Sequence, residues 1–375
     1  MGWGFVAVTP VEVIFSGDLI LDEPDPDYWL AGIAAAIRRA DISIGHLEVA
    51  HTDRGREQAG DVPAPGADPA HLAALQRAGF DALTLAGNHI ADQGAQGIAD
   101  TVAELDRLGI RHCGAGANLE AARRPAILEA AGIRLALLSY NCVGPELSWA
   151  STDRAGCAFI RVNTRDGSPI TPAGALQNID PASLAEMSAD IAKVRRDANF
   201  VVVALHKGVV HTPATLAPYE RPLAHAAIDA GADAVIGHHA HILRGIEMYR
   251  GNPIFHGLGN GCVVTRALSP AQEHAERAAW AHKRKALFGF EPDPAFVLAP
   301  FHPEAVNAML ARICLQQDGR VKAGFYPVRV LAPGRPVLAD PFDGAHIAEY
   351  VAKITRQAAL PPLRMASEHG VINIA

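Results

Sequence analysis

Short apolar runs alternate with longer segments of helical spacing along much of the chain. The run at 200–205 is strongly apolar and has the length of a strand, whereas 97–108 is amphipathic with helical spacing and ends at Gly109. Strands separated by helices of roughly 10–15 residues indicate an α/β sheet protein. The pattern predicts strands at 11–16, 41–44, 80–85, 134–140, 200–205 and 234–236, and helices at 69–78, 97–108, 184–197 and 222–230.

The pattern changes toward the C-terminus. Segments 311–316 and 321–331 flank Asp318-Gly319, a hairpin turn signal, and therefore predict antiparallel strands. Segment 141–181 is rich in Gly, Pro, Ser and Thr, and segment 266–304 combines a polar helix with a Pro-rich stretch. We expect a single domain over residues 1–375, in which these two segments are insertions that cover the site and set its specificity.

Composition and charge exclude several classes of protein. With 375 residues, 49% hydrophobic and 19% charged, the chain has a globular composition and enough apolar residues for a large core. The net charge of −7 and a single dense basic run at 282–285 argue against nucleic-acid binding. The five cysteines form no C-x-x-C pair, which favours a reducing compartment. The sequence shows no export signal or membrane anchor, and predicts a cytoplasmic protein without membrane contact.

Polar side chains of metal-binding type follow the predicted strands. In open α/β sheets, ligands bind outside the carboxyl ends of the strands. Each such residue alone is more often part of a turn, a cap or a hydrogen-bonded histidine. Three histidines within 238–241, however, are hard to explain by packing, and imidazole, carboxylate and amide donors without thiolate suit divalent transition metals. The strand-end residues that predict this metal site are Asp18, Glu48, Asn88, His89, His206, His239 and His241.

A set of motifs in a fixed order carries a resemblance to a known family. The chain resembles the CapA family of capsule and poly-γ-glutamate biosynthesis proteins, within the calcineurin-like metallophosphoesterase superfamily. The resemblance extends from about residue 11 to 262 and, more weakly, through the hairpin at 311–331. The motifs are Ser16-Gly17-Asp18, His46-Leu47-Glu48, Gly87-Asn88-His89, Leu205-His206-Lys207-Gly208, the stretch 229–247 and Gly257-Leu258-Gly259-Asn260.

The resemblance implies a fold and a set of metal ligands. The fold is α/β, a four-layer α-β-β-α sandwich of metallophosphoesterase type with two mixed β-sheets and a C-terminal β-hairpin. One or two divalent metal ions would lie at one sheet edge, and the donor types are compatible with Mn, Zn, Fe or Co. By motif position the ligands are Asp18 and His241 for the first ion, Asn88, His206 and His239 for the second, and Glu48 for both.

The resemblance also implies hydrolysis. The metal ions would activate a water molecule and polarise the scissile group. His89 matches the general acid of the superfamily, which protonates the leaving group. Asp92, three residues later, either orients His89 from the same helical turn or serves as an N-terminal helix charge.

The chain departs from the family pattern at several positions. Ile20 stands where the superfamily has the histidine of Asp-x-His, so the first metal site lacks a usual ligand. His46 replaces the usual asparagine and is interpreted as a ligand, a substrate contact or a strand cap. Lys207 replaces the usual tryptophan and either binds an anionic substrate or extends its amine to solvent. His211 is a further candidate for substrate binding, and His256 has no assigned role.

Three functions stay open on the sequence. The favoured one is a metal-dependent hydrolase that cleaves an amide bond, such as a γ-glutamyl bond, or a related bond of a small anionic substrate. The alternatives are a metal-dependent phosphoesterase and a non-enzymatic partner in poly-γ-glutamate or capsule synthesis. The acidic segment 22–27 would repel a polyanion if it faces the site. Assembly into a homo-oligomer is left open.

Overall fold

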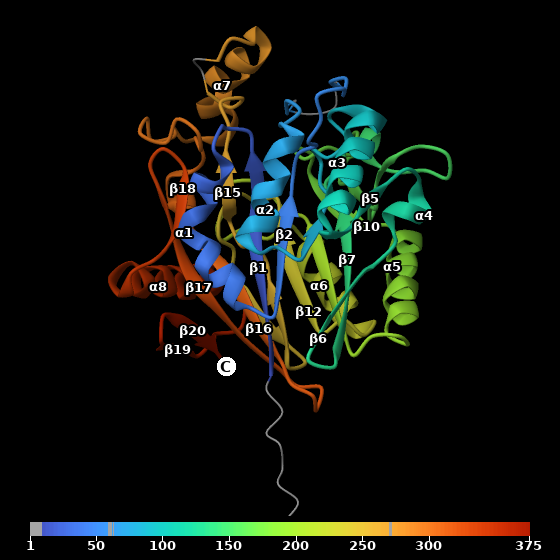
Figure 1. Cartoon of the computed structure of the whole chain (residues 1–375), viewed down its shortest axis with the longest axis vertical. Coiled ribbons are helices and arrows are strands. Elements are labelled where there is room, and N and C mark those ends of the chain that lie inside the picture. Colours follow the sequence, from blue (N-terminus) through green and yellow to red (C-terminus); the bar gives the residue numbers. More distant parts are fainter. Residues whose placement is uncertain (1–9, 59–61, 63, 270–271) are drawn as a thin grey trace, which may run out of the picture.

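Two β-sheets pack face to face, and helices cover their outer faces (Figure 1). This computed structural model describes residues 10–58, 62, 64–269 and 272–375. The four-layer α-β-β-α prediction is confirmed, because α1, α2 and α3 cover the larger sheet and α5 and α6 cover the smaller one. The helices are α1 (Pro26–Arg39), α2 (Leu72–Ala78), α3 (Gly94–Leu108), α4 (Leu119–Ala122), α5 (Pro181–Val194), α6 (Glu220–Asp229), α7 (Ala275–Phe288) and α8 (Pro341–Gln357), with 3-10 turns at Pro69–His71, Glu146–Ser148 and Pro303–Val306.

The larger sheet has the order β19-β20-β17-β16-β1-β2-β3-β4, with β15 paired to β1 and β18 paired to β17. Strands β2, β3, β4 and β15 run parallel to β1, whereas β16 pairs antiparallel with both β1 and β17. The predicted C-terminal hairpin is therefore confirmed as part of this sheet. Its strands are β1 (Val11–Leu21), β2 (Ile42–Leu47), β3 (Ala82–Thr84), β4 (Arg111–Cys113), β15 (Asn260–Val264), β16 (Asn307–Leu315), β17 (Val321–Leu331), β18 (Arg335–Leu338), β19 (Met365–Glu368) and β20 (Val371–Ile374).

The smaller sheet has the order β13-β14-β12-β11-β7-β6. Its four inner strands are parallel, and β13 and β6 pair antiparallel at the two edges. Two short ladders, β5 with β8 and β9 with β10, lie outside both sheets. The strands are β6 (Ala126–Ala130), β7 (Ile133–Asn141), β11 (Phe200–His206), β12 (Ala234–His238), β13 (Ile246–Tyr249) and β14 (Asn252–Phe255), and in the ladders β5 (Ala115–Gly116), β8 (Gly156–Cys157), β9 (Val162–Thr164) and β10 (Leu176–Ile179).

The apolar core between the sheets comes from alternate residues of their strands. Phe15 of β1 and Ile44 of β2 belong to the same buried cluster as Leu137 of β7 and Val202 of β11. Burial of such side chains contributes roughly 1.5–3 kcal/mol each. Helix α8 adds Ile347 and other apolar residues to this inner cluster, so it closes one side of the sandwich rather than covering an outer face.

Strand β1 changes its neighbour halfway along its length. It pairs with β16 over 11–15 and with β15 over 18–21. Gly17 lies at the change, where an added Cβ would be 2.0 Å from the carbonyl oxygen of Gly259, so only glycine fits this close approach. The prediction that the strand ends at Ser16 is therefore wrong, and Asp18 lies inside β1.

Candidate metal centre

The predicted ligand residues meet at one edge of the sandwich, where both sheets contribute side chains. Asp18 lies on β1 and Glu48 directly follows β2. His206 ends β11, and His239 and His241 follow β12. All of these side chains are buried or nearly so. The expectation that separate strands deliver metal-binding groups to one edge is thus met by the geometry, while the role of these groups as ligands remains a prediction.

Asp18, Glu48 and His241 form the first group. His241 Nε2 lies 3.2 Å from Glu48 Oε1, and His241 Nδ1 lies 3.4 Å from Asp18 Oδ2. One potential ligand atom from each of the three residues lies within 4.8 Å of the others. Asn260, to which the sequence interpretation gave no role, contacts His241 Nδ1 through Oδ1 at 2.9 Å. Asn260 is the first residue of β15, so this strand, which pairs with β1, also contributes a side chain to the site.

Asn88, His206 and His239 form the second group. His206 Nε2 is 2.7 Å from Asn88 Oδ1 and 3.1 Å from His239 Nδ1. Its other nitrogen, Nδ1, is buried and makes no hydrogen bond among the described residues, and the same holds for His239 Nε2. A buried polar atom without a partner costs about 1–3 kcal/mol, and such atoms in a native protein call for an explanation such as a bound ion.

His46 lies between the two groups, a placement that the sequence left open. Thr84 Oγ1 donates to Gly45 O at 3.3 Å, so it accepts the hydrogen bond from His46 Nδ1 at 2.9 Å. This arrangement leaves Nε2 of His46 as a lone-pair donor, and this atom has no hydrogen bond in the described structure. Asp18, His46 and His206 also offer ligand atoms within 4.8 Å of one another. His238 stacks on His46 and reaches Asp18 Oδ1 at 3.2 Å.

Burial and mutual repulsion perturb the acid groups of the centre. Burial, together with the charge of Glu48, raises the pKa of Asp18 to about 7. Burial would also raise the pKa of Glu48, but the charge and hydrogen bond of His241 outweigh it and lower that pKa to about 2. The pKa of His241 rises to about 9 because Glu48 and Asp18 outweigh the effect of its burial. Close like charges and unpartnered donors fit a site built for cations, so the residues present suit a divalent ion.

His89 and Asp92 lie side by side at the edge of the same centre. His89 Nδ1 is 2.7 Å from Asp92 Oδ2, and that oxygen also accepts from the backbone N–H of Ala64 at 2.9 Å. Of the two roles considered for Asp92, the geometry favours the one in which it orients His89, because the carboxylate fixes which ring nitrogen carries the proton.

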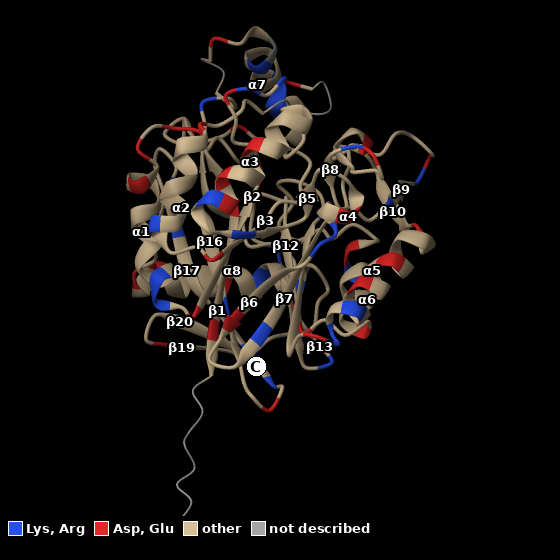
Figure 2. Cartoon of the chain, turned by 45° about the vertical axis from the view of Figure 1, so that its right-hand side comes forward, with Lys and Arg blue, Asp and Glu red and all other residues tan. Residues whose placement is uncertain are grey.

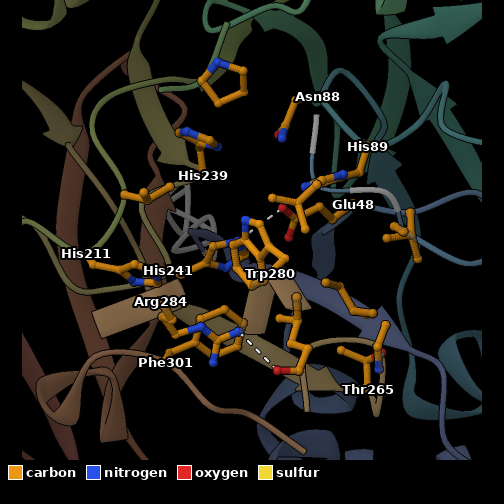
Figure 3. A pocket seen from close by; sticks show the side chains of 18 of the residues that line it. Glu48, Asn88, His89, His211, His239, His241, Thr265, Trp280, Arg284 and Phe301 are labelled. Atoms are coloured by element: carbon orange, nitrogen blue, oxygen red, sulfur yellow. Dashed lines mark hydrogen bonds and ion pairs between the residues drawn. The ribbon is translucent and has the colours of Figure 1, made fainter. Parts of the chain in front are cut away.

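A cavity of about 460 Å³ opens beyond these residues. Figure 3 shows Asn88 and His239 on one side of it and Arg284 and Phe301 on the other. His211, a candidate for substrate binding, lines the cavity; burial, followed by the charges of neighbouring groups, lowers its pKa well below the usual value. Segment 266–304 supplies most of the cover through α7 and Phe301, whereas segment 141–181 contributes only Pro172 and Ala173 among the described lining residues.

Lys207 does not face the cavity in this structure, and the prediction that it binds substrate is wrong. Its side chain is fully buried, and Nζ lies 2.9 Å from Glu220 Oε2 and 3.2 Å from His256 Nδ1. A buried ammonium needs such partners, so the lysine turns into the protein instead of extending to solvent or to the cavity. Arg244, also fully buried, shares Glu220 at 3.1 Å.

The acidic segment 22–27 divides between the cavity and the surface. Asp22 lines the cavity and accepts a hydrogen bond from Thr265 Oγ1 at 2.6 Å. Glu23 pairs with Arg266 and Asp27 with Arg77, both away from the cavity lining. One carboxylate of this segment therefore faces the site.

An α-β-β-α sandwich with a cluster of His, Asp, Glu and Asn at the carboxyl edge of its strands defines a protein of the metallophosphoesterase fold class. The family profile described as bacterial capsule synthesis protein PGA_cap matches residues 12–263. The chain belongs to this family, as the motif order predicted.

Curated proteins with similar sequences have names that refer to polyglutamine, PGA or capsule synthesis. The chain is 36% identical over 199 residues to the probable polyglutamine synthesis accessory protein of Mycobacterium tuberculosis, covering 51% of this chain and 47% of the relative. It is 32% identical over 209 residues to the PGA biosynthesis protein CapA of Bacillus subtilis, covering 54% and 49%. For the capsule biosynthesis protein CapA of Bacillus anthracis the values are 28% over 245 residues, 64% and 55%. The chain spans about half the length of these curated relatives.

Solved structures show weaker similarity. A hypothetical protein from Thermus thermophilus matches with a TM-score of 0.45 and 18% identity, covering 84% of this chain and 99% of the other. The calcineurin-like phosphoesterase YfkN from Bacillus subtilis matches with a TM-score of 0.40 and 13% identity, covering 94% and 97%. Within the described residues, no helix has both the length and the apolar character needed to cross a membrane.

Proposed function

We propose that this protein is a metal-dependent hydrolase. The observation that carries the proposal is the crowding of buried His, Asp, Glu and Asn side chains at the sheet edge. Ligand atoms of Asp18, Glu48 and His241 lie within 4.8 Å of one another, and His206 Nε2 lies 2.7 Å from Asn88 Oδ1 and 3.1 Å from His239 Nδ1. In the proposal, Asp18, Glu48 and His241 hold one divalent ion, and Asn88, His206 and His239 hold a second. When bound, such ions supply Lewis acidity and acidify water for attack.

His89 supplies the proton for the leaving group. Asp92 holds the ring through Nδ1, so Nε2 is the nitrogen that exchanges a proton with the substrate in the cavity. The same contact fixes the orientation of the ring toward the cavity. Neither residue belongs to the proposed ligand groups, so proton transfer and metal binding are separate tasks of neighbouring side chains.

The bond that we propose is an amide, including the γ-glutamyl type. The names of the relatives refer to polyglutamine, PGA or capsule synthesis, which supports a substrate with amide-linked glutamyl groups. A phosphoester is the second candidate, and it is supported by the metallophosphoesterase fold class. A cation at Lys207 that faced the cavity would favour this candidate, but the lysine is buried against Glu220 and gives no such support.

Elemental analysis of the purified protein tests the metal. We expect one or two equivalents of Mn, Zn, Fe or Co in the wild type and a loss in His239→Ala, with His346→Ala as a matched control because that exposed histidine lies on α8. The metal-loaded protein is then assayed against γ-glutamyl amides and against generic phosphoesters. A wild type that binds no metal, or a loaded protein that hydrolyses neither panel, would overturn the proposal.

A further inference from the structure

The cavity beside the candidate centre is lined largely by carbon. Ile20 and Val49 line it from the ends of β1 and β2. Leu268, Trp280 and Phe288 line it from segment 266–304, hereafter the covering segment. A volume of about 460 Å³ lies in the range of sites for small molecules rather than of open polymer grooves. Apolar lining around a few polar groups favours ligands that bury a large apolar substituent.

Aromatic rings form the part of this cavity nearest the proposed ligands. The ring of Phe301 stacks on His241, with centroids 4.7 Å apart and an angle of 25°. The ring of His211 has Phe288 at 4.9 Å and Phe290 at 5.1 Å, both edge-on. Offset and edge-to-face contacts between aromatic groups are favourable. The rings that line this cavity could therefore make such contacts with an aromatic ring of a ligand.

The charges around the cavity argue against a polyanionic chain. Arg284 is 3% exposed, and its two terminal nitrogens donate to the backbone oxygens of Pro300 and Leu268, so they are engaged within segment 266–304. Asp22 adds a carboxyl group to the wall. Lys283 is exposed at the rim, and no ion pair is described for it in the residues that the structure covers. Figure 2 shows this basic part of α7 above the sheet edge.

We propose that the substrate is a small amide that carries an aromatic or similarly bulky apolar group and a single carboxylate. The apolar group would occupy the space between Phe288 and Phe301, and the carboxylate would pair with Lys283. The scissile amide would then lie over Glu48, His89 and His241. This inference rests on the proposed hydrolase function, because it names the substrate class of the same site.

Equilibrium binding to the metal-loaded His89→Gln protein, in which the proposed proton donor is absent, tests the inference without turnover, and the variants below are made in this background. The probes are N-phenylacetylglycine and N-acetylglycine, which share one amide and one carboxylate and differ by the phenyl ring. By calorimetry we expect the phenyl compound to bind about 10- to 100-fold more tightly, as burial of an aromatic ring predicts. In Phe288→Ala and Phe301→Ala this preference should fall to about threefold or less. Lys283→Gln should weaken both probes by the same factor.

The matched control is Phe342→Ala, because Phe342 is 72% exposed on α8 and lies outside the cavity lining. This variant should keep the full preference for the phenyl compound. Equal binding of both probes, or tighter binding of a γ-glutamyl tetramer than of the phenyl compound, would overturn the inference. Tight binding of the phenyl compound, together with a wild type that hydrolyses no amide, would support the inference and contradict the proposed hydrolase function.

Discussion

At the scale of single residues, the hydroxyl of Thr84 fixes which ring nitrogen of His46 keeps the lone pair that a metal ion would need. The hydrogen bond from His46 Nδ1 to Thr84 Oγ1 at 2.9 Å places the ring proton on Nδ1 and leaves a lone pair on Nε2. A ring nitrogen of His46 lies within 4.8 Å of ligand atoms of Asp18 and His206. Among the proposed donors, His46 is the one at which this chain departs from the asparagine usual in the family that it resembles.

We predict that His46→Asn weakens metal binding about 10- to 100-fold, and that Thr84→Val weakens it by about tenfold because the ring tautomer is no longer fixed. Competition titration against a chelator, together with the absorption spectrum of the Co²⁺-loaded protein, measures both effects. If both variants bind metal as the wild type does, His46 is a packing residue that caps β2 and not a ligand.

In the proposed function, His89 and Asp92 transfer a proton and bind no metal. We predict that His89→Gln lowers kcat by about 10²- to 10⁴-fold, whereas Asp92→Asn lowers it by about tenfold, since the acid is then present but less well oriented. Metal content should stay at the wild-type value in both variants. A loss of metal in either one would place that residue among the ligands instead.

At the scale of elements, the start of α6 anchors the loop that follows β11. Glu220 lies at this start and accepts from Lys207, Arg244 and the backbone N–H of Ala217. Burial would raise the pKa of Glu220, but the two cations outweigh it and lower the pKa to about 2. Because this folded-state pKa lies below the usual 4.5, the carboxylate stabilises the fold above about pH 4.5, and this contribution is lost as the pH falls toward 2.

We predict that Glu220→Gln lowers the free energy of unfolding by about 3–5 kcal/mol at pH 7, because two buried cations lose their counterion. The difference from the wild type should shrink as the pH is lowered from about 5 to about 3. Urea denaturation of the chelator-treated proteins at several pH values measures it, with Glu349→Gln on the exposed face of α8 as the control. A difference that does not change with pH would show that this carboxylate is not the source of the stability.

The elements also show what the sequence could and could not predict. The strand ends near Glu48, Asn88 and His206 were predictable because apolar runs of strand length end in polar residues there. Helix α1 is missing from the sequence-based prediction, because its start at Pro26 lies within the acidic segment 22–27 and Asp25 before it makes no side-chain cap hydrogen bond. The partner of Lys207 lies on a different element, and pairings of that kind depend on the tertiary fold rather than on local pattern.

The chemistry of the site was more predictable than its cover. Motif order placed Asp18 and His241 in one group, and the structure brings their side chains together. The aromatic lining from Phe288 and Phe301 gave no signal, because single aromatic residues in a polar segment have no periodicity that distinguishes a cavity wall from a surface. Terminal elements such as α8 were also not predicted, although α8 fills part of the inter-sheet core.

At the scale of the whole molecule, the candidate centre connects the two sheets. Asp18 and Glu48 come from the larger sheet, whereas His206 and His239 come from the smaller one. A metal ion held by both groups would stabilise the packing of one sheet against the other, since any ligand that binds only the folded state raises its stability.

We predict that a chelator lowers the Tm of the wild type by about 3–5 °C and that metal at about 100 to 1,000 times its Kd restores it. Differential scanning calorimetry measures the shift. His239→Ala should show no such response, whereas His346→Ala should respond as the wild type does. A wild-type Tm that is the same with and without chelator would mean that the sheets hold their relative position without the ion.

The covering segment leaves the larger sheet after β15 and rejoins it at β16, so α7 stands outside the strands that carry the proposed ligands (Figure 1). Under the proposed function, the residues that would bind metal and transfer a proton lie in other stretches of the chain than Trp280, Phe288 and Phe301 of the cavity wall. Recombination that exchanges residues 266–304 would then alter this part of the wall while leaving the proposed ligands in place.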